Sequence, residues 1–204
     1  MKRGTKIGLI VLGVVLLFIF ILYRTFVGTY NELVQLDENV KNAWAQVQNQ
    51  YQRRADLIPN LVETVKGYAS HERETLEAVI NARAKATQVQ VDPARLLENP
   101  QLMQQFARAQ GELSSALSRL MVVIERYPDL KANQNFIALQ TQLEGTENRI
   151  ATERRRFNEQ VRVYNQTIRK FPTVFIANLF GFREKPYFEA AAEAQQAPRV
   201  KFTQ

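Results

Sequence analysis

An unbroken apolar run near the N-terminus constrains this chain more than any other feature of its sequence. Residues 7–23, IGLIVLGVVLLFIFILY, carry no charge, and residues 25–27 extend the run weakly beyond Arg24. At ~1.5 Å per residue, a helix of about 20 residues matches the ~30 Å hydrocarbon layer of a bilayer. We therefore expect residues 7–27 to form a transmembrane helix through which the chain is held in a lipid bilayer.

The start of the chain also has the form of a signal peptide, since residues 1–6, MKRGTK, are a basic tail. The apolar core is long for a cleaved signal, and LYRTFVGTY at its end lacks a pair of small residues for cleavage, so we favour an uncleaved signal anchor. Lys2, Arg3 and Lys6 precede the uncharged run 7–23, whereas Arg24 and then only Lys41 follow it. This charge difference predicts a cytoplasmic N-terminus and a body outside the cytoplasm.

Beyond the anchor, apolar or small residues recur at steps of three and four from Leu33 to Val65. Such a stripe is one face of a helix. The stripe keeps its phase across Pro59, whereas a helix that ended there would have no reason to restart in register. We therefore expect Pro59 to kink one helix that runs to about residue 68, and we expect Asn60 or a water molecule to satisfy the carbonyl of Ala55 that the proline frees.

Three further helices follow from periodicity and from helix-start signals. The second is expected over about residues 71–88, with Ser70 as its N-cap and an apolar face of Leu76, Val79, Ile80 and Ala84. In the connector, Asp92-Pro93 and Asn99-Pro100 each have the form of an N-cap followed by proline at the first helical position. The third helix, 100–127, and the fourth, about 134–170, have heptad spacing, which in the fourth comprises Phe136, Leu143, Ile150, Phe157, Tyr164 and Phe171.

No segment of the body alternates with period two over a length that favours a strand. The predicted fold is all-α: an N-terminal transmembrane helix followed by an elongated antiparallel four-helix bundle, residues 28–171, with long first and last helices. Residues 172–188 form an aromatic amphipathic segment. Residues 189–204 are rich in alanine and glutamine, and we expect a flexible tail there.

The direction of the last helix gives the aromatic segment its predicted role. In an antiparallel bundle the fourth helix returns toward the membrane, so the segment arrives near the lipid surface. We expect it to contact the membrane interface or a neighbouring protomer, with burial against the helix bases as the alternative. The residues concerned are Phe171, Phe175, Ile176, Leu179, Phe180 and Phe182.

The sequence has few of the residues on which enzyme and metal sites are built. It contains no cysteine and a single histidine, His71, and it has no Glu-x-x-His pair, phosphate loop or nucleophile elbow. Four of the 27 basic residues flank the span, so the remaining 23 face 20 acidic residues and give the body a net charge of only +3. We therefore expect no catalytic, metal or cofactor site and no nucleic-acid partner.

Several polar, basic and aromatic side chains are candidates for interhelical contacts. Trp44 lies on the first apolar stripe, where a core contact is favoured over a ligand pocket. Residues 154–156 are three arginines, which we expect to be solvated beside Glu153 and Glu159 rather than bound to lipid headgroups. Polar residues in or beside the seams would have to be paired and would fix the helix register. The candidates are Asp56, Asn60, Glu147 and Asn148, with Asp37, Asn42, Arg54, Asn158 and Asn165 as further members.

Two long blocks of the chain resemble the LemA family of bacterial membrane proteins. They are YNELVQLDENVKNAWAQVQNQYQRRADLIPNLVETVKGYASHE and ERYPDLKANQNFIALQTQLEGTENRIATERRRFNEQVRVYNQTIRKFP, and the resemblance runs from about residue 5 to 190. It implies an N-terminally anchored antiparallel helical bundle in the bacterial inner membrane and no established enzymatic activity. Magnetosome-associated relatives connect part of the family with membrane shaping, although nothing in this sequence is specific to magnetosomes.

From these observations we expect a non-enzymatic envelope scaffold or interaction protein. It would self-associate or bind envelope proteins whose identity the sequence does not give. A sensory or ligand-binding bundle outside the cytoplasm is the alternative, although the chain has a single span and no signalling module.

Overall fold

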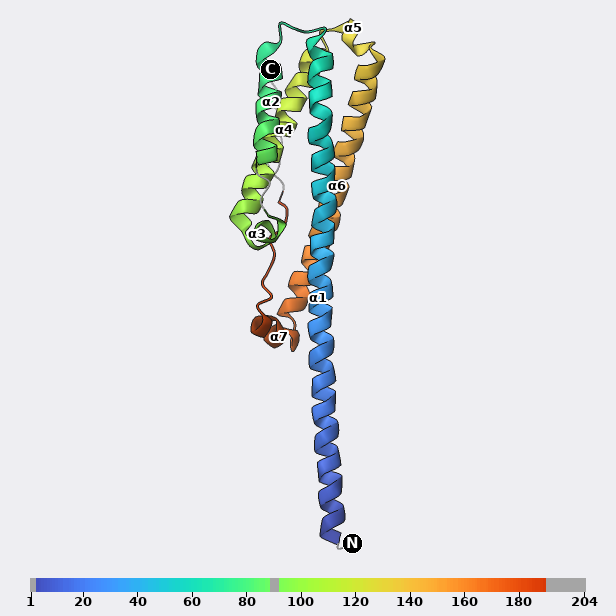
Figure 1. Cartoon of the computed structure of the whole chain (residues 1–204), viewed down its shortest axis with the longest axis vertical. Coiled ribbons are helices and arrows are strands. Elements are labelled where there is room, and N and C mark those ends of the chain that lie inside the picture. Colours follow the sequence, from blue (N-terminus) through green and yellow to red (C-terminus); the bar gives the residue numbers. More distant parts are fainter. Residues whose placement is uncertain (1–2, 89–91, 190–204) are drawn as a thin grey trace, which may run out of the picture.

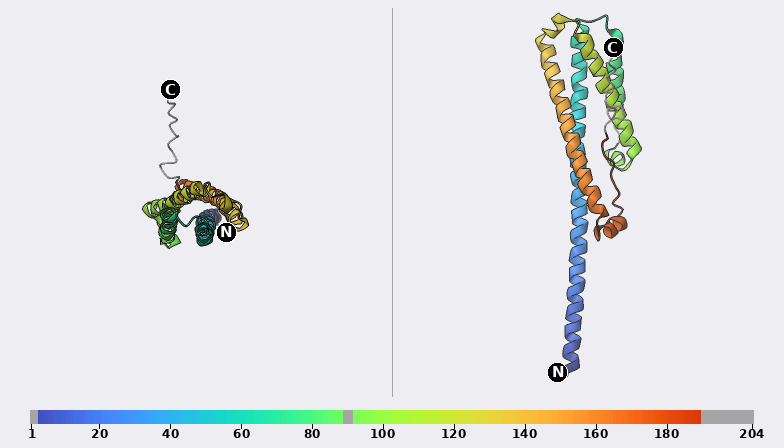
Figure 2. Two further views of the ribbon diagram at one scale, coloured as in Figure 1. Left: turned by 90° about the horizontal axis from the view of Figure 1, so that it is seen from above. Right: turned by 180° about the vertical axis from the view of Figure 1, so that it is seen from behind.

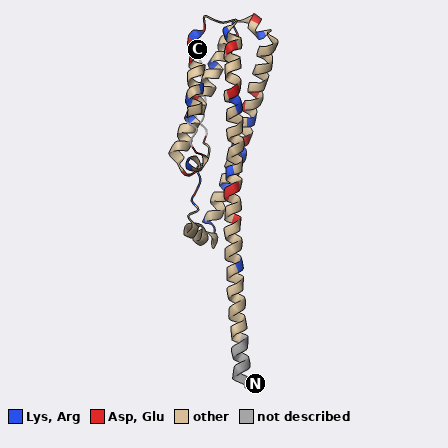
Figure 3. Cartoon of the chain, in the orientation of Figure 1, with Lys and Arg blue, Asp and Glu red and all other residues tan. Residues whose placement is uncertain are grey.

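The computed structural model describes residues 3–88 and 92–189. Its dominant element is α1 (Arg3–Lys66), one helix of 64 residues that contains both the apolar run and the first helix of the bundle. Figure 1 shows the N-terminal part of α1 extending far beyond the other helices. Among the described residues, α1 is the one helix long and apolar enough to cross a membrane, and its apolar window is not buried by any other part of the chain. Between its grey N-terminal tip and the bundle, α1 shows few charged residues (Figure 3).

The remaining described elements are helices too, so the predicted all-α class is confirmed. They are α2 (Arg73–Gln88), α3 (Pro93–Glu98), α4 (Pro100–Ile124), α5 (Pro128–Lys131), α6 (Gln134–Arg169) and α7 (Thr173–Phe180). The view from above shows α1 between α2 and α6 (Figure 2). The closest packing joins α1 to α6 and α2 to α4, and α1 also packs against α2.

Two of the predicted start signals, Asp92-Pro93 and Asn99-Pro100, mark helices as expected. The side chain of Asp92 accepts a hydrogen bond from the N–H of Ala94 at the start of α3, and Asn99 accepts two at the start of α4. Asn133 caps α6 by accepting from Phe136 N–H at 3.1 Å. These bonds satisfy donors that the first turn of each helix leaves without a partner.

The boundaries and faces differ from the prediction in several places, among them the end of α4 at Ile124 rather than at residue 127. α1 ends at Lys66, and α2 begins at Arg73, so Ser70 is not its N-cap. The YPDLKAN break holds the short helix α5. The predicted apolar face of α2 was wrong in part because Ile80 is 48% exposed and Ala84 is exposed, while Ala82 and Ala86 are buried. Those two small residues let α2 lie close to its neighbours.

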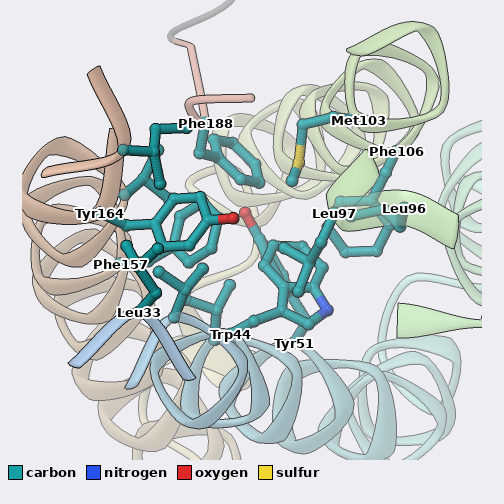
Figure 4. Packing of buried hydrophobic residues seen from close by; sticks show 14 of the residues in the cluster. Leu33, Trp44, Tyr51, Leu96, Leu97, Met103, Phe106, Phe157, Tyr164 and Phe188 are labelled. Atoms are coloured by element: carbon teal, nitrogen blue, oxygen red, sulfur yellow. The ribbon is translucent and has the colours of Figure 1, made fainter. Parts of the chain in front are cut away.

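Two hydrophobic clusters fill the bundle, one above the other along α1. The lower cluster is centred on Trp44, which is fully buried against the rings of Phe106 and Phe157 at centroid distances of 5.3 Å (Figure 4). The upper cluster runs from Ile58 to Ala69 of α1 and the turn after it, and includes residues of α2, α4, α5 and α6. The expectation that Trp44 makes a core contact is therefore confirmed.

Some expectations fall wholly or partly outside the described residues. The predicted flexible tail, 189–204, has only Glu189 within them, and the basic N-terminal tail has residues 3–6 within α1.

Candidate functional site

The short helix α7 lies at the base of the bundle, beside the part of α1 that leaves the apolar run. A cis peptide bond between Phe171 and Pro172 precedes it. The helix ends at Phe180, and Gly181 after it has a φ of 76°, a left-handed conformation that favours glycine. The N–H of Phe182 donates to the carbonyl of Ala177, and that of Gly181 to Asn178, which together form a Schellman cap. The cap reverses the chain and sends it back along the bundle.

The six predicted contact residues of this segment divide into two groups. Ile176 is buried in the lower cluster. Phe180 packs against α1, with its ring centroid 4.7 Å from that of Tyr30 and 5.8 Å from that of Phe26, and Phe182 lies 6.0 Å from Tyr30.

The other three residues point away from the bundle. Phe171 is 81% exposed, Phe175 66% and Leu179 70%. Phe175 and Leu179 are four residues apart on α7 and so share one side of it, and the ring of Phe171, which precedes the helix, lies 5.9 Å from that of Phe175. We call these three side chains the basal face. The segment is thus capped against α1 on one side and apolar toward the surroundings on the other.

After α7, residues 182–189 form an extended strap that returns along α6. Two asparagines of α6 hold it, each with both atoms of its amide. Asn165 donates to the carbonyl of Lys185 and accepts from its N–H, both at 2.9 Å. Asn158 makes the same pair of bonds with Phe188, at 2.9 and 2.8 Å. The Phe188 side chain is buried beside Trp44 in the lower cluster (Figure 4).

An ion pair joins the strap to α1. The Nζ atom of Lys185, whose side chain is only 7% exposed, lies 2.7 Å from a carboxylate oxygen of Asp37. Lys41 lies 2.8 Å from the other oxygen. Burial by itself raises the pKa of Asp37, but the hydrogen bonds from the two lysines outweigh burial and leave that pKa below its usual value. The carboxylate therefore stays charged and holds the strap near neutral pH.

A buried arginine connects the helices at the level between the two clusters. The guanidinium of Arg54, whose side chain is 1% exposed, donates to Ser114 Oγ at 2.8 Å and to Glu147 Oε1 at 2.7 Å. It also donates to the side chain of Gln110. The amide of Gln110 in turn donates to the carbonyl of Ala86. This polar layer therefore links α1, α4, α6 and α2.

Pro59, about one turn beyond Arg54, lies inside α1 as predicted. α1 continues through Pro59 to Lys66, so Pro59 neither ends nor restarts a helix. The freed carbonyl of Ala55 does have a partner, but the partner is Arg83 of α2, whose Nε–H donates to it at 2.7 Å. The expected partner was Asn60 or a water molecule; Asn60 was wrong, because it is exposed and its own carbonyl accepts from Thr64.

An open trough separates α4 from α6 above the polar layer. Its volume is about 500 Å³. Leu117, Met121 and Leu143 supply its apolar side chains, and Glu144 and Glu147 line it as well. A smaller cavity of about 90 Å³ below it also has Glu147 in its lining.

The structure brings only one of the four main polar seam candidates into the interhelical layer. Glu147 pairs with Arg54, whereas Asp56, Asn60 and Asn148 are exposed. Of the further candidates, Asn42 is exposed, while Asp37, Arg54, Asn158 and Asn165 make the contacts described above.

Sequence reasoning missed Arg83, Gln110 and Lys185. Arg83 was discoverable, because the face of α2 that contains Leu76, Val79 and Ala86 also contains residue 83.

The three consecutive arginines, residues 154–156, differ in their surroundings. Arg154 stacks over the Phe188 ring at 3.9 Å, while Arg155 and Arg156 are exposed. No cluster of three or more His, Asp or Glu side chains suited to a metal occurs among the described residues.

Comparison with known proteins finds a family model and several relatives that this chain is similar to. A model described as the LemA family matches residues 43–202 of the chain. Magnetosome protein MamQ 1 of Paramagnetospirillum magneticum is 28% identical over 202 residues, covering 92% of this chain and 74% of the relative. Magnetosome protein MamQ of Magnetospirillum gryphiswaldense is 28% identical over 203 residues, with the same coverage. Protein LemA of Metamycoplasma hominis is 26% identical over 176 residues, covering 86% of this chain and 76% of the relative.

Proposed function

Because this chain belongs to the LemA family, we propose that it is a non-enzymatic scaffold of the bacterial envelope, which α1 anchors in the inner membrane and holds at a fixed height above it. The observation that carries this proposal is the continuity of α1 from Arg3 to Lys66. A helix that passes from the span into the bundle without a loop transmits its position and tilt directly. From Phe26 to Lys66 such a helix rises ~60 Å.

The orientation follows from the basic residues at the two ends of the span. Lys2, Arg3 and Lys6 lie before the uncharged run 7–23, and Arg24 and then only Lys41 lie behind it, which favours an N-terminus in the cytoplasm and a bundle on the other side. Self-association belongs to the same proposal. A second copy, or another envelope protein, would cover the trough that α4 and α6 leave open.

Measuring the height of the bundle above the bilayer tests whether α1 acts as a rigid strut, that is, a helix that holds the bundle at a fixed height. The chain has no native cysteine, so a single dye can be placed at Ser70→Cys, and energy transfer to labelled lipid in a nanodisc reports its height. We expect one narrow distance for the native chain and a broad, shorter one when a flexible Gly/Ser linker is inserted after Gly28. The same linker after Glu189 is the control and should change nothing. A broad distance in the native chain would overturn the strut.

The mass of the full-length assembly in mild detergent tests self-association. A multiple of the 23.5 kDa chain mass, lost on Met121→Glu in the trough, supports it. A monomer at all concentrations contradicts it.

A second candidate function rests on the trough itself. Its volume of about 500 Å³ lies in the usual range of small-molecule sites, and it combines apolar side chains with carboxylates. A ligand-binding bundle is therefore the alternative. A small molecule that raises the unfolding temperature of the native chain, but not of the Met121→Glu variant, would favour this reading over the scaffold.

A further inference from the structure

The basal face has no partner within the described chain, although its residues are large and apolar. Phe171, Phe175 and Leu179 are all more than 60% exposed, while Ile176 and Ala177 on the other side of α7 are buried. The rings of Phe171 and Phe175 lie 5.9 Å apart and form one continuous apolar surface. Isolated exposed apolar residues are ordinary, but a contiguous group of this kind marks a contact.

The position of α7 identifies what covers that surface. Its Phe180 ring packs on Phe26, which belongs to the expected span, and on Tyr30, one turn beyond it. A helix fixed at this level of α1 lies where hydrocarbon gives way to lipid headgroups. We propose that α7 is an interfacial helix, and that its basal face inserts into the outer boundary of the same bilayer that holds α1. This inference rests on the proposed anchoring of α1.

The charges around α7 suit a lipid surface. Arg169, Lys170 and Arg183 flank the helix and are exposed, and Glu184 is the acidic residue beside them, 3.6 Å from Arg169. The flanks therefore carry a net positive charge next to an apolar face, the combination by which interfacial helices bind anionic membranes. Arg24 adds another cation near the same level of α1.

A second membrane contact changes what the anchor can do. A single helix in a bilayer is free to rotate about its axis and to tilt. Because α7 is fixed to α1 and α6 by its buried side, insertion of the basal face would select one rotation and one tilt of the rod. The bundle would then present the trough in a set direction relative to the membrane.

Fluorescence quenching in nanodiscs of mixed zwitterionic and anionic lipid tests this proposal on the full chain. An environment-sensitive dye is attached to one cysteine at a time: Phe175→Cys on the basal face, Ile21→Cys in the span and Ser70→Cys at the far end of the bundle. Replacing Phe175 leaves the core intact, because its side chain is 66% exposed. Unchanged emission of Trp44 confirms that each variant is folded.

We expect spin-labelled lipid to quench the dye at position 175 about as strongly as a dye near the headgroups, and we expect the bilayer to shield it from aqueous iodide. Quenching by lipid should be several-fold stronger, and quenching by iodide several-fold weaker, than at position 70. Shielding from iodide without quenching by lipid, lost when each disc holds a single copy, would show that a second copy covers the face and would overturn the proposal. Free access of iodide would overturn it as well. The dye at position 21 separates these results from failure of the anchor, since its quenching by lipid reports α1 alone.

Discussion

The hydrogen bond from Arg83 to the carbonyl of Ala55 predicts that residues 59 and 83 are energetically coupled. Pro59 has no N–H, so the carbonyl four residues earlier loses its helical donor, and Arg83 Nε replaces that donor at 2.7 Å. Arg83→Met keeps the apolar stem and removes the donor. With Ala55 buried, the change should cost about 1.5–3 kcal/mol, the range for a bond to a charged group.

The same change should cost less when residue 59 has an N–H. In Pro59→Ala the helix supplies the missing donor, so removal of Arg83 should then cost only about 0.5–1 kcal/mol. The coupling energy of the cycle is therefore about 1–2 kcal/mol. Pro59→Ala alone should stabilise the bundle by about 2 kcal/mol, because the ~3 kcal/mol penalty of proline in a helix is offset in part by its restriction of the unfolded chain.

Urea unfolding of the full-length chain in mild detergent measures all four corners of the cycle. Trp44 is the single tryptophan and is fully buried, so its emission reports the bundle and not the span. Arg73→Met is the matched control on α2, since its side chain is 85% exposed, and it should change stability by less than about 0.5 kcal/mol. If Arg83→Met costs the same in the native chain as in the Pro59→Ala variant, the bond to the carbonyl contributes nothing and the reasoning is refuted.

Three further predictions concern the polar layer and the strap. In urea unfolding, Glu147→Gln should destabilise the bundle by about 3 kcal/mol, which is more than the cost of Arg54→Met. Glu147→Gln leaves a buried guanidinium without its carboxylate, whereas in Arg54→Met the remaining carboxylate of Glu147 is solvated. The reverse order of the two costs would contradict this prediction. The lowered pKa of Asp37 means that the stability it contributes is complete above the unfolded pKa, near 3.8, and is lost as the pH falls through the folded one. Acid should therefore destabilise the native chain, and Asp37→Asn should remove the part of this pH dependence that Asp37 contributes. Asn158→Ala should speed amide exchange at Phe188 about tenfold, with no change at the caps of α4.

Periodicity was enough to predict the helices and most of the core. The sevenfold spacing from Phe136 to Tyr164 is buried throughout, and proline after an Asp or Asn marked two helix starts correctly. These features are local, because a repeat or a cap is decided by residues a few positions apart. Phe171 continued the same spacing and yet lies outside the core, since α6 has already ended at Arg169.

The contacts of the candidate sites could not be predicted in the same way. The rotation of α2 about its own axis decides which donor reaches the carbonyl of Ala55. The prediction placed Ile80 on the inner face of α2, and this rotation turned the face that contains Arg83 away from α1. The strap was missed because extended chain has no periodicity to detect. Its partners, Asn158 and Asn165, were visible as polar residues on an apolar helix, but their amides bind backbone 20 to 30 residues away.

The polar layer explains how a bundle built on heptads keeps one vertical register. An apolar stripe that repeats every seven residues packs almost as well when one helix slides by a heptad, a shift of ~10 Å. Arg54 removes this freedom, because a one-heptad slide of α6 would move Glu147 away from a guanidinium whose side chain is only 1% exposed. Arg83 fixes α2 in the same way, since the carbonyl of Ala55 is free only where Pro59 stands. The proposed scaffold role needs this fixed register more than extra stability, because that role depends on the height at which each helix is held.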